Sequence, residues 1–358
     1  MKNGTMNKPS EVEVKPSLER EFTSKEIDQE TQTKISVYDQ LRPKNEGPFM
    51  SAVRELEKKA GFETPIVYFN ILVLVMFHVL ILVSAYLIFI DRRYYPKRQT
   101  FIFLFSLTLL TTFGVTAGAH RLWSHRAYKA KIPLQIMLLI GFLTAGMNDL
   151  YNWVRDHRVH HKFSETSADP HNATRGFFFS HVGWMMTKQH PDVLREAVKV
   201  DMSDIEGNPL IRFHVRHFKI LKLLFALVLP VLIPVVFWDE RISVAFLALV
   251  LKHAYILHTM WSVNSFAHLY GNRPYNSKIN PRENWVLSVF SIGEGWHNYH
   301  HTFPWDYKAA ELAFPFNGTT NLLDLFAKVG WAYDRKMASP ALIKNVAESK
   351  GDSPYNEI

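Results

Sequence analysis

The chain of 358 residues contains no cysteine. It therefore cannot form disulfide bonds, and it cannot hold a zinc finger or an iron–sulfur cluster through thiolates. The sequence also lacks a G-x-G-x-x-G segment of the kind that binds dinucleotides, so electrons for a redox reaction would have to come from another protein. Any metal ion in this protein must be bound by nitrogen and oxygen atoms.

Charged residues are nearly absent from four long apolar stretches. Each has about 20 residues, enough for a helix to cross the hydrocarbon core of a membrane. A further apolar stretch, 136–147, has only about a dozen residues, which suits an interfacial or buried helix better than a span. We predict membrane-spanning helices over residues 65–90, 100–119, 222–238 and 242–261.

The polar remainder of the chain falls largely on one side of this membrane. An even number of spans places both termini on the same side, together with residues 120–220 and 262–340. Lysine and arginine are more frequent near the span ends on this side, which favours the cytosol. We expect residues 61–340 to form one membrane-embedded domain, residues 1–60 to be disordered because they are polar and mixed in charge, and residues 341–358 to form a polar tail.

The formal net charge is +8. A basic surface beside a membrane favours contact with anionic lipid, an acidic protein or a phosphorylated substrate. We expect membrane lipid to be a partner, and we expect no nucleic acid partner.

Nine histidines are grouped in four short segments. The pattern H-x-x-H-H occurs at 157–161 and again at 297–301, and on a helix positions i, i+3 and i+4 share one face. Each copy can therefore turn three imidazoles toward one point. His120 and His125 are five residues apart, about 140° of rotation on a regular helix, so they need a helix end or an unwound turn to converge.

This histidine set predicts a metal centre rather than ordinary packing. Nine imidazoles suit two ions with four or five ligands each, and Asn264, four residues before His268, could hold a water molecule at one of them. Zinc alone rarely needs so many nitrogens, whereas imidazole suits iron well. The predicted ligands are His120, His125, His157, His160, His161, His268, His297, His300 and His301.

Acidic residues near these histidines could orient the imidazole rings. Asp156, Asp169 and Glu294 are close enough in sequence to accept hydrogen bonds from ring N–H groups. The remaining eight histidines are expected to be structural: His78, His171, His181, His190, His214, His217, His253 and His258.

A histidine-ligated site for two metal ions beside membrane spans suits the oxidation of a lipid. Unactivated C–H bonds need a strong oxidant and a dry, shaped tunnel that fixes which carbon reacts. Two other classes stay open: a di-iron lipid hydroxylase or sterol oxidase, and a metal-binding membrane protein or transporter. A transporter would have polar residues lining its spans, whereas these histidines are predicted to lie outside them.

Five segments of the sequence form a recognisable set. They are H-R-L-W-S-H at 120–125, R-D-H-R-V-H-H at 155–161, D-P-H at 169–171, G-F-F-F-S-H-V-G-W at 176–184 and G-E-G-W-H-N-Y-H-H-T-F-P at 293–304. This set resembles the animal acyl-CoA desaturases, the stearoyl-CoA Δ9-desaturase family. The resemblance covers roughly residues 65–335.

The resemblance implies an all-α integral membrane protein of the endoplasmic reticulum, with a cytosolic helical domain that carries a di-iron site. Such an enzyme uses O2 and electrons from cytochrome b5, reduced by NADH–cytochrome b5 reductase, to insert a cis double bond into a fatty acyl-CoA. By position, the nine histidines would bind two Fe2+ ions and Asn264 would hold a metal-bound water. The residues that match the family's contacts with the CoA thioester or head group are Asn70, Asn148, Arg155, Asp156, Lys188 and Trp261.

Several positions depart from the family pattern. Near the bend of the acyl tunnel, relatives usually carry Gln and Thr where this chain has Met147 and Met260, while the neighbouring Trp153 is kept. Two flexible thioethers should keep the tunnel apolar and change its bend. Gln189 stands where relatives have a second basic residue, and Thr108 stands where some have Tyr, which leaves room for longer chains.

The family implies desaturation at Δ9 of saturated C16–C18 chains. The two methionines make Δ11, or Δ12 on a monounsaturated acyl-CoA, the alternatives. The chemistry is the same in each case, and only the position of the double bond differs.

Overall fold

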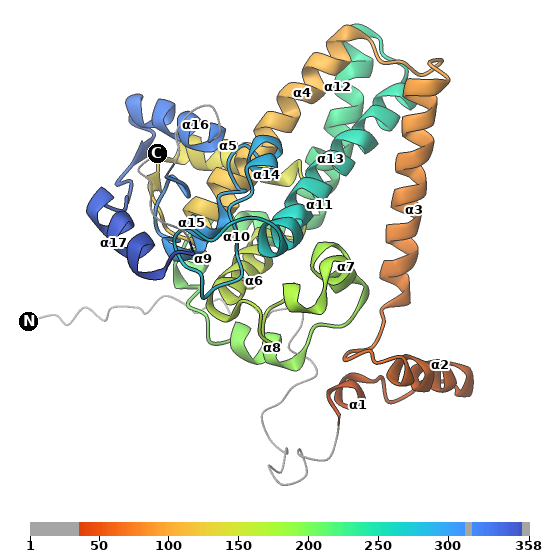
Figure 1. Cartoon of the computed structure of the whole chain (residues 1–358). Coiled ribbons are helices and arrows are strands. Elements are labelled where there is room, and N and C mark those ends of the chain that lie inside the picture. Colours follow the sequence, from red (N-terminus) through yellow and green to blue (C-terminus); the bar gives the residue numbers. More distant parts are fainter. Residues whose placement is uncertain (1–35, 312–316, 353–358) are drawn as a thin grey trace, which may run out of the picture.

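Nearly all of the regular structure is helical. The computed structural model describes residues 36–311 and 317–352 (Figure 1). Within these residues, four helices are long and apolar enough to cross a membrane, as the sequence predicted: Tyr68–Ile90, Arg98–Ser124, Phe218–Trp238 and Ile242–Leu269.

The first span is helix α3 (Tyr68–Ala85), which continues as a π-helical turn, η2 (Tyr86–Ile90). Its apolar side chains face outward, since Leu72, Met76 and Leu82 are 58%, 60% and 70% exposed. In water such a surface would be costly, whereas in a bilayer it contacts lipid chains. The predicted span, 65–90, has the same end as the observed one and begins three residues earlier.

The second span extends beyond its most apolar sequence. Helix α4 (Arg98–Phe113) runs into a long π-helical segment, η3 (Gly114–Ser124). We predicted an end at residue 119, but the helix continues to Ser124 because protein packs around its last turn, where Arg121 is 1% exposed. This extension places His120 inside a helix.

The third and fourth spans form a hairpin. The third combines α11 (Phe218–Leu223), the π turn η6 (Leu224–Val228) and α12 (Leu229–Trp238). The fourth is a single helix, α13 (Ile242–Leu269). We predicted that it ends at residue 261. It instead extends into the histidine-rich region, because polar residues continue a helix once protein surrounds them.

The turns at one end of the two hairpins are tied together. Glu240, buried between α12 and α13, accepts hydrogen bonds from the Thr100 hydroxyl (2.7 Å) and from the backbone N–H of Lys97 (2.8 Å). In Figure 1 these turns lie at the top, away from α6 and α15. The four spans therefore share one loop end and leave the other end free for the site.

Helix α5 (Ile132–Leu143) packs against η3. Glycine permits the close approach: a Cβ on Gly114 would lie 2.4 Å from the Phe142 nitrogen, and one on Gly141 would lie 2.4 Å from the Leu110 oxygen. This short buried helix corresponds to the fifth apolar stretch in the sequence. It forms part of the largest apolar core.

Shorter elements cover the end of the spans where the histidines lie. They are α6 (Leu150–Phe163), η4 (Ala173–Arg175), α7 (Phe177–His181), η5 (Gly183–Met186), α8 (Pro191–Ala197), α9 (Ser203–Glu206), α10 (Pro209–Arg216), α14 (Trp285–Phe290), α15 (His297–Thr302) and α16 (Gly318–Lys328). Strand β1 (Lys129–Ala130) pairs antiparallel with β2 (Ala332–Tyr333), and so joins the end of the second span to the C-terminal part.

Two helices precede the first span: α1 (Val37–Leu41) and α2 (Pro48–Lys59). We expected residues 1–60 to be disordered, and the structure differs over these helices because buried polar groups fix them in place. Arg54 and Glu57 pair at 2.9 Å, and both are at most 6% exposed. The rest of that prediction, for residues 1–35, lies outside the described residues.

The C-terminal segment is also helical. We expected a polar tail over 341–358, but α17 (Pro340–Lys350) places Ile343 and Ala347 on one buried face. These two side chains belong to a small apolar cluster with Tyr275 and Tyr299. Residues four apart share a helix face, so even a short amphipathic helix can dock. Residues 353–358 lie outside the described residues.

Candidate metal centre

The structure brings all nine predicted histidines together at one end of the spans. They come from η3 and the residue after it, from α6, from α13 and from α15. They form two groups, in each of which one ring nitrogen of every histidine lies within 4.8 Å of the others. The first group contains His120, His125, His157, His161 and His300, and the second contains His160, His268, His297 and His301.

Each H-x-x-H-H copy is divided between the two groups. The expectation that three imidazoles of one copy converge on one point is wrong, because i+3 and i+4 are about 100° apart around a helix. On α6, the i and i+4 residues His157 and His161 enter the first group, and His160 enters the second. On α15 the division is reversed, since His297 and His301 enter the second group. The two helices thus exchange roles.

A π-helical turn brings His120 and His125 together. In η3 the backbone hydrogen bonds close on the fifth residue, and the His125 N–H donates to the His120 carbonyl at 3.1 Å. Residues five apart therefore lie one above the other, and the two ring centroids are 4.9 Å apart. The sequence predicted a helix end or an unwound turn, and a widened turn at the end of a helix is present.

The Nε2 atoms of neighbouring rings face one another. His300 Nε2 lies 2.8 Å from His120 Nε2 and 3.1 Å from His161 Nε2. In the second group, His297 Nε2 lies 3.0 Å from His268 Nε2 and 3.1 Å from His301 Nε2. One ring proton cannot satisfy three converging nitrogens. Two nitrogens bound at right angles, each about 2.1 Å from one ion, are about 3.0 Å apart, so a metal ion fits this arrangement.

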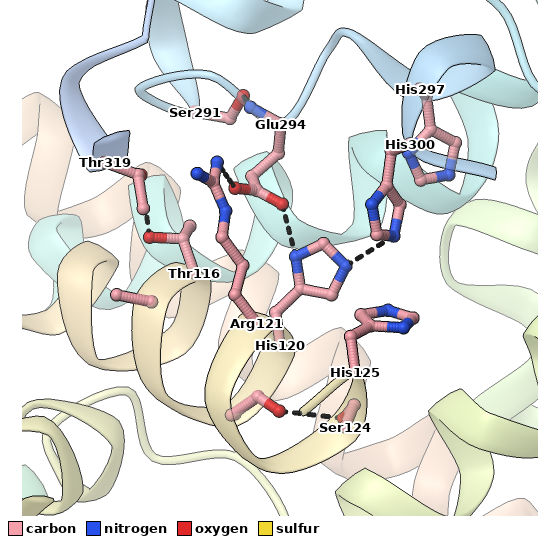
Figure 2. Close-up of polar contacts among 12 residues, drawn as sticks. Thr116, His120, Arg121, Ser124, His125, Ser291, Glu294, His297, His300 and Thr319 are labelled. Carbon is pink, nitrogen blue, oxygen red and sulfur yellow. Dashed lines mark hydrogen bonds and ion pairs between the residues drawn. The ribbon is translucent and has the colours of Figure 1, made fainter. Parts of the chain in front are cut away.

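Carboxylates hold the opposite nitrogen of three rings. Glu294 contacts His120 Nδ1 at 2.5 Å (Figure 2), Asp169 contacts His160 Nδ1 at 2.9 Å, and Glu165 contacts His268 Nδ1 at 2.6 Å. A carboxylate at Nδ1 fixes the proton there and leaves the Nε2 lone pair directed at the metal position.

Burial keeps most of these imidazoles neutral, as metal ligands must be. Burial, and then the competition of neighbouring imidazoles for a proton, lowers the pKa of six of the rings well below its ordinary value: those of His125, His157, His161, His297, His300 and His301. Burial also lowers the pKa of His160, but the Asp169 carboxylate outweighs it and raises that pKa overall. Burial raises the pKa of Glu294, yet Arg121 and His120 lower it to about 2.

The partners of the ligand rings differ in part from the sequence prediction. Asp169 and Glu294 both contact ligand rings, as predicted, but Glu294 contacts the distant His120 rather than a ring near it in sequence. Asp156 does not, because its carboxylate pairs with Arg155 at 2.8 Å. The structure adds Glu165, which contacts His268. Its only signal in the sequence is its position four residues after His161. In the structure it lies in a turn, with a φ of 60°.

Arg121 is a second residue that sequence reasoning missed. Its guanidinium group, 1% exposed, pairs with Glu294 at 2.7 Å (Figure 2). It also donates to the Tyr307 carbonyl at 3.0 Å. Arg121 thereby holds the carboxylate that holds His120. His171, predicted to be structural, lies beside the second group, since its ring nitrogen, Asp169 and His160 could together hold an ion.

Three of the four residues predicted to shape the acyl tunnel pack against the same apolar core. Met147, Trp153 and Met260 all contact the largest apolar cluster. The Trp153 ring stacks on His157, with centroids 5.1 Å apart and planes 14° apart. This core therefore borders the metal centre. Thr108 lies on α4, where its hydroxyl donates to a carbonyl of its own helix at 2.7 Å.

Four of the six predicted head-group residues lie on α3, on α6 and just after η5. The Asn70 amide, at the start of α3, donates to the Met185 carbonyl at 2.7 Å, and exposed Lys188 follows η5. Arg155 and Asp156 form an ion pair on α6, and Gln189 donates to that carboxylate.

The last two predicted head-group residues lie elsewhere. Trp261 is buried on α13, where its ring meets the stacked rings of His181 and His258 edge-on, with centroids 5.9 Å and 5.0 Å away. Asn148 is exposed just before α6, where its side chain accepts from the next backbone N–H at 2.9 Å.

These features define a multi-pass membrane protein with a buried candidate metal site of nine histidines at one end of its spans. The sequence model of the fatty acid desaturase family matches residues 99–317, which is more than half of the chain. The chain belongs to the fatty acid desaturase family. It is an enzyme of the oxidoreductase class.

Curated relatives with different regiochemistry are similar to this chain to the same degree. The acyl-CoA Delta-9 desaturase of Acheta domesticus is 44% identical over 86% of this chain and 85% of its own length. The acyl-CoA Delta12-desaturase of the same species is 45% identical over 85% of this chain and 84% of its own length. The acyl-CoA Delta(11) desaturase of Spodoptera littoralis is 47% identical over 82% and 86%. Overall identity therefore does not distinguish the three positions.

Proposed function

We propose that this protein is an acyl-CoA desaturase that inserts a cis double bond into a fatty acyl-CoA. The observation that carries the proposal is the pair of histidine groups, with converging Nε2 atoms and carboxylates at three Nδ1 atoms. In the overall reaction, O2 accepts two hydrogens from the acyl chain together with two electrons and two protons from outside. The products are two water molecules and the unsaturated chain.

The five histidines of the first group would hold one iron ion, and the four histidines of the second group would hold another. The two ions would supply the oxidising power for C–H cleavage. The protein residues then have distinct tasks. Glu294, Asp169 and Glu165 keep the protons of three rings on Nδ1. Asn264, one turn before His268 on α13, would hold a water at the four-histidine group. Trp153, stacked on His157, excludes bulk water beside the ligands and forms a wall for the acyl chain.

The head group of the substrate would be recognised by Asn70, Asn148, Arg155, Asp156, Lys188 and Trp261. Arginine and lysine suit the phosphates of coenzyme A, and amide side chains suit its polar linker. The Arg155–Asp156 pair, which does not face a ligand ring, is free for this task.

We infer that the enzyme works in the endoplasmic reticulum membrane with both termini and the metal centre on the cytosolic side. Cytochrome b5 would supply the electrons after reduction by NADH–cytochrome b5 reductase. The excess of basic side chains, +8 overall, supports docking of an acidic electron donor near the bilayer.

For the double bond, we propose Δ9 of saturated C16–C18 chains, with Δ11 or Δ12 as the alternative. Met147 and Met260 support the alternative, because both pack in the core that borders the metal centre. A change of side chain there alters which carbon lies opposite the irons without altering the ligands.

Expression in a yeast that lacks its own desaturase tests this function. Saturated and monounsaturated chains are fed separately, and double bonds in total fatty acids are mapped by mass spectrometry. New Δ9 monoenes from saturated chains are the expected result. Double bonds elsewhere, or only in fed monoenes, establish the alternative regiochemistry. Hydroxylated chains, or no new product from protein present in the membrane, contradict the proposal.

A further inference from the structure

Helices α1 and α2 are joined to the body of the protein through one buried carboxylate. Glu57, 5% exposed, accepts hydrogen bonds from the Tyr38 hydroxyl at 2.5 Å and from the Ile66 N–H at 3.1 Å. It also pairs with Arg54 at 2.9 Å and accepts from the Tyr68 hydroxyl. A buried charge with this many partners is expensive to disturb, so the two helices have a defined position.

The extended segment that follows α2 pairs with the segment that carries Lys188. Ile66 forms an antiparallel bridge with Thr187. The Lys188 N–H donates to the Pro65 carbonyl at 2.9 Å, and the Val67 N–H donates to the Met186 carbonyl at 2.8 Å. The backbone of Lys188 is therefore fixed to the same segment that anchors α1 and α2.

The side chain of Lys188 contacts α1 directly. Its Nζ donates to the carbonyl of Leu41, the last residue of α1, at 3.0 Å. Carbonyls at the end of a helix have no partner within the helix and attract cations. An ammonium group has three donors, so two remain for a ligand.

Two adjoining cavities lie in the region where α1 and α2 meet the body of the protein. One, of about 290 Å³, is lined by Lys188, Gln189 and Arg175. The other, of about 340 Å³, lies between α1–α2 and the body and is lined by Tyr38 and Lys58. Both are bordered by Glu63, Ser167 and His190.

We propose that α1 and α2 form a cap that holds the Lys188 ammonium group in place for the phosphate-bearing head group of the substrate. This inference rests on the proposed function, in which Lys188 contacts acyl-CoA. A free lysine loses its rotamer freedom when it binds a ligand, whereas a lysine already held by Leu41 loses less.

A single proline in α1 tests the cap in the full-length protein. The Gln40 N–H donates to the Ser36 carbonyl at 3.1 Å inside α1, and proline removes this bond and the helical geometry around it. Gln40→Pro should raise KM for stearoyl-CoA about 3- to 10-fold and leave kcat nearly unchanged. Gln40→Ala is the matched control, because it also changes this exposed side chain but keeps the backbone N–H and the helix, so its KM should stay well below that of Gln40→Pro.

A double-mutant cycle tests whether the cap acts through Lys188. Lys188→Ala should raise KM by itself, and adding Gln40→Pro should raise it no further. The affinity for coenzyme A alone, measured by calorimetry in detergent, should follow the same pattern. An unchanged or lower KM in Gln40→Pro overturns the cap, and so does an equal added rise in the Lys188→Ala background.

The test separates failure of the cap from failure of the proposed function. If the wild type makes no unsaturated product, the function is wrong, whereas normal turnover with unchanged KM in Gln40→Pro contradicts only the cap. Size-exclusion behaviour and metal content establish that the variants are folded. If Gln40→Pro does not fold, Tyr38→Phe serves instead, because it removes the hydroxyl that ties α1 to Glu57.

Discussion

The two histidine groups use one kind of ligand but orient it in different ways. Two of the four rings in the second group have a carboxylate at Nδ1, from Asp169 and Glu165 in the loop after α6. In the first group only His120 has one, from Glu294, and the π-helical turn places His120 and His125 together instead. Backbone geometry thus does in one group what acidic side chains do in the other.

The first group has five histidines and the second has four because the spans contribute unequally. Helices α6 and α15 contribute three histidines each, divided in opposite senses, so they supply an equal share to both groups. The difference comes from the spans: η3 and the residue after it add two rings to the first group, whereas α13 adds only His268 to the second. The proposed water on Asn264 would fill the place of the missing imidazole.

The largest effect is expected from His160→Ala. His160 is the only ligand that α6 gives to the second group, so its loss should abolish desaturation and lower the bound metal by about one of two ions. Yeast complementation and metal analysis of the purified protein measure these effects. The variant should stay in the membrane fraction, and near-normal turnover would refute the ligand assignment.

The loop carboxylates give the next largest effect. Glu165→Gln keeps the size of the side chain but removes the charge at His268 Nδ1, and should weaken metal binding or activity about 10- to 100-fold. Metal affinity is measured by competition with a chelator. Glu348→Gln, on the exposed face of α17, is the matched control and should have no effect. Equal metal affinity in the two variants would mean that carboxylates do not orient the second group.

A smaller effect on rate is expected from changes in the apolar core between the groups and the membrane. The pair Met147→Gln and Met260→Thr should move the position of the double bond while turnover stays within a few-fold, because neither side chain is a ligand. Double bonds are mapped by mass spectrometry with the wild type in parallel. If they do not move at all, these positions do not set the bend of the tunnel.

The smallest effect is expected from Thr108→Tyr on α4. A bulky ring at this partly buried position should reduce the space for long chains and shift the products toward shorter ones. The product ratio from mixed C16 and C18 feeding measures the shift. Thr108→Ser, which keeps the hydroxyl without filling space, should leave the ratio unchanged.

The spans and the histidine set could be predicted because both are local in sequence. Apolar windows give the part of a helix that contacts lipid, however, and not its full length. They therefore missed the continuation of α13 to Leu269, where His268 faces protein. The division of His157 and His160 between groups depends on the position of α15, which no local pattern contains.

Contacts between distant polar residues were the least predictable. Glu165 contacts His268, 103 positions away, and Arg121 contacts Glu294, 173 positions away. Burial makes such pairs specific. Nothing in the composition of 1–60 indicated that Glu57 would accept hydrogen bonds from Tyr38 and Ile66. A polar, mixed-charge segment is folded when its charges have buried partners.

The length of α13 links the site to the bilayer itself. Its 28 residues span about 42 Å, longer than the hydrocarbon core of about 30 Å, and it runs without interruption from the loop end of the hairpin to His268. A long helix responds to a thinner or thicker bilayer by tilting. Because Met260, Asn264 and His268 lie on this one helix, such a tilt would move the proposed tunnel wall and the proposed metal ligand together. The thickness of a membrane depends on the saturation of its lipid chains, so the geometry of the proposed site would respond to the lipid around it.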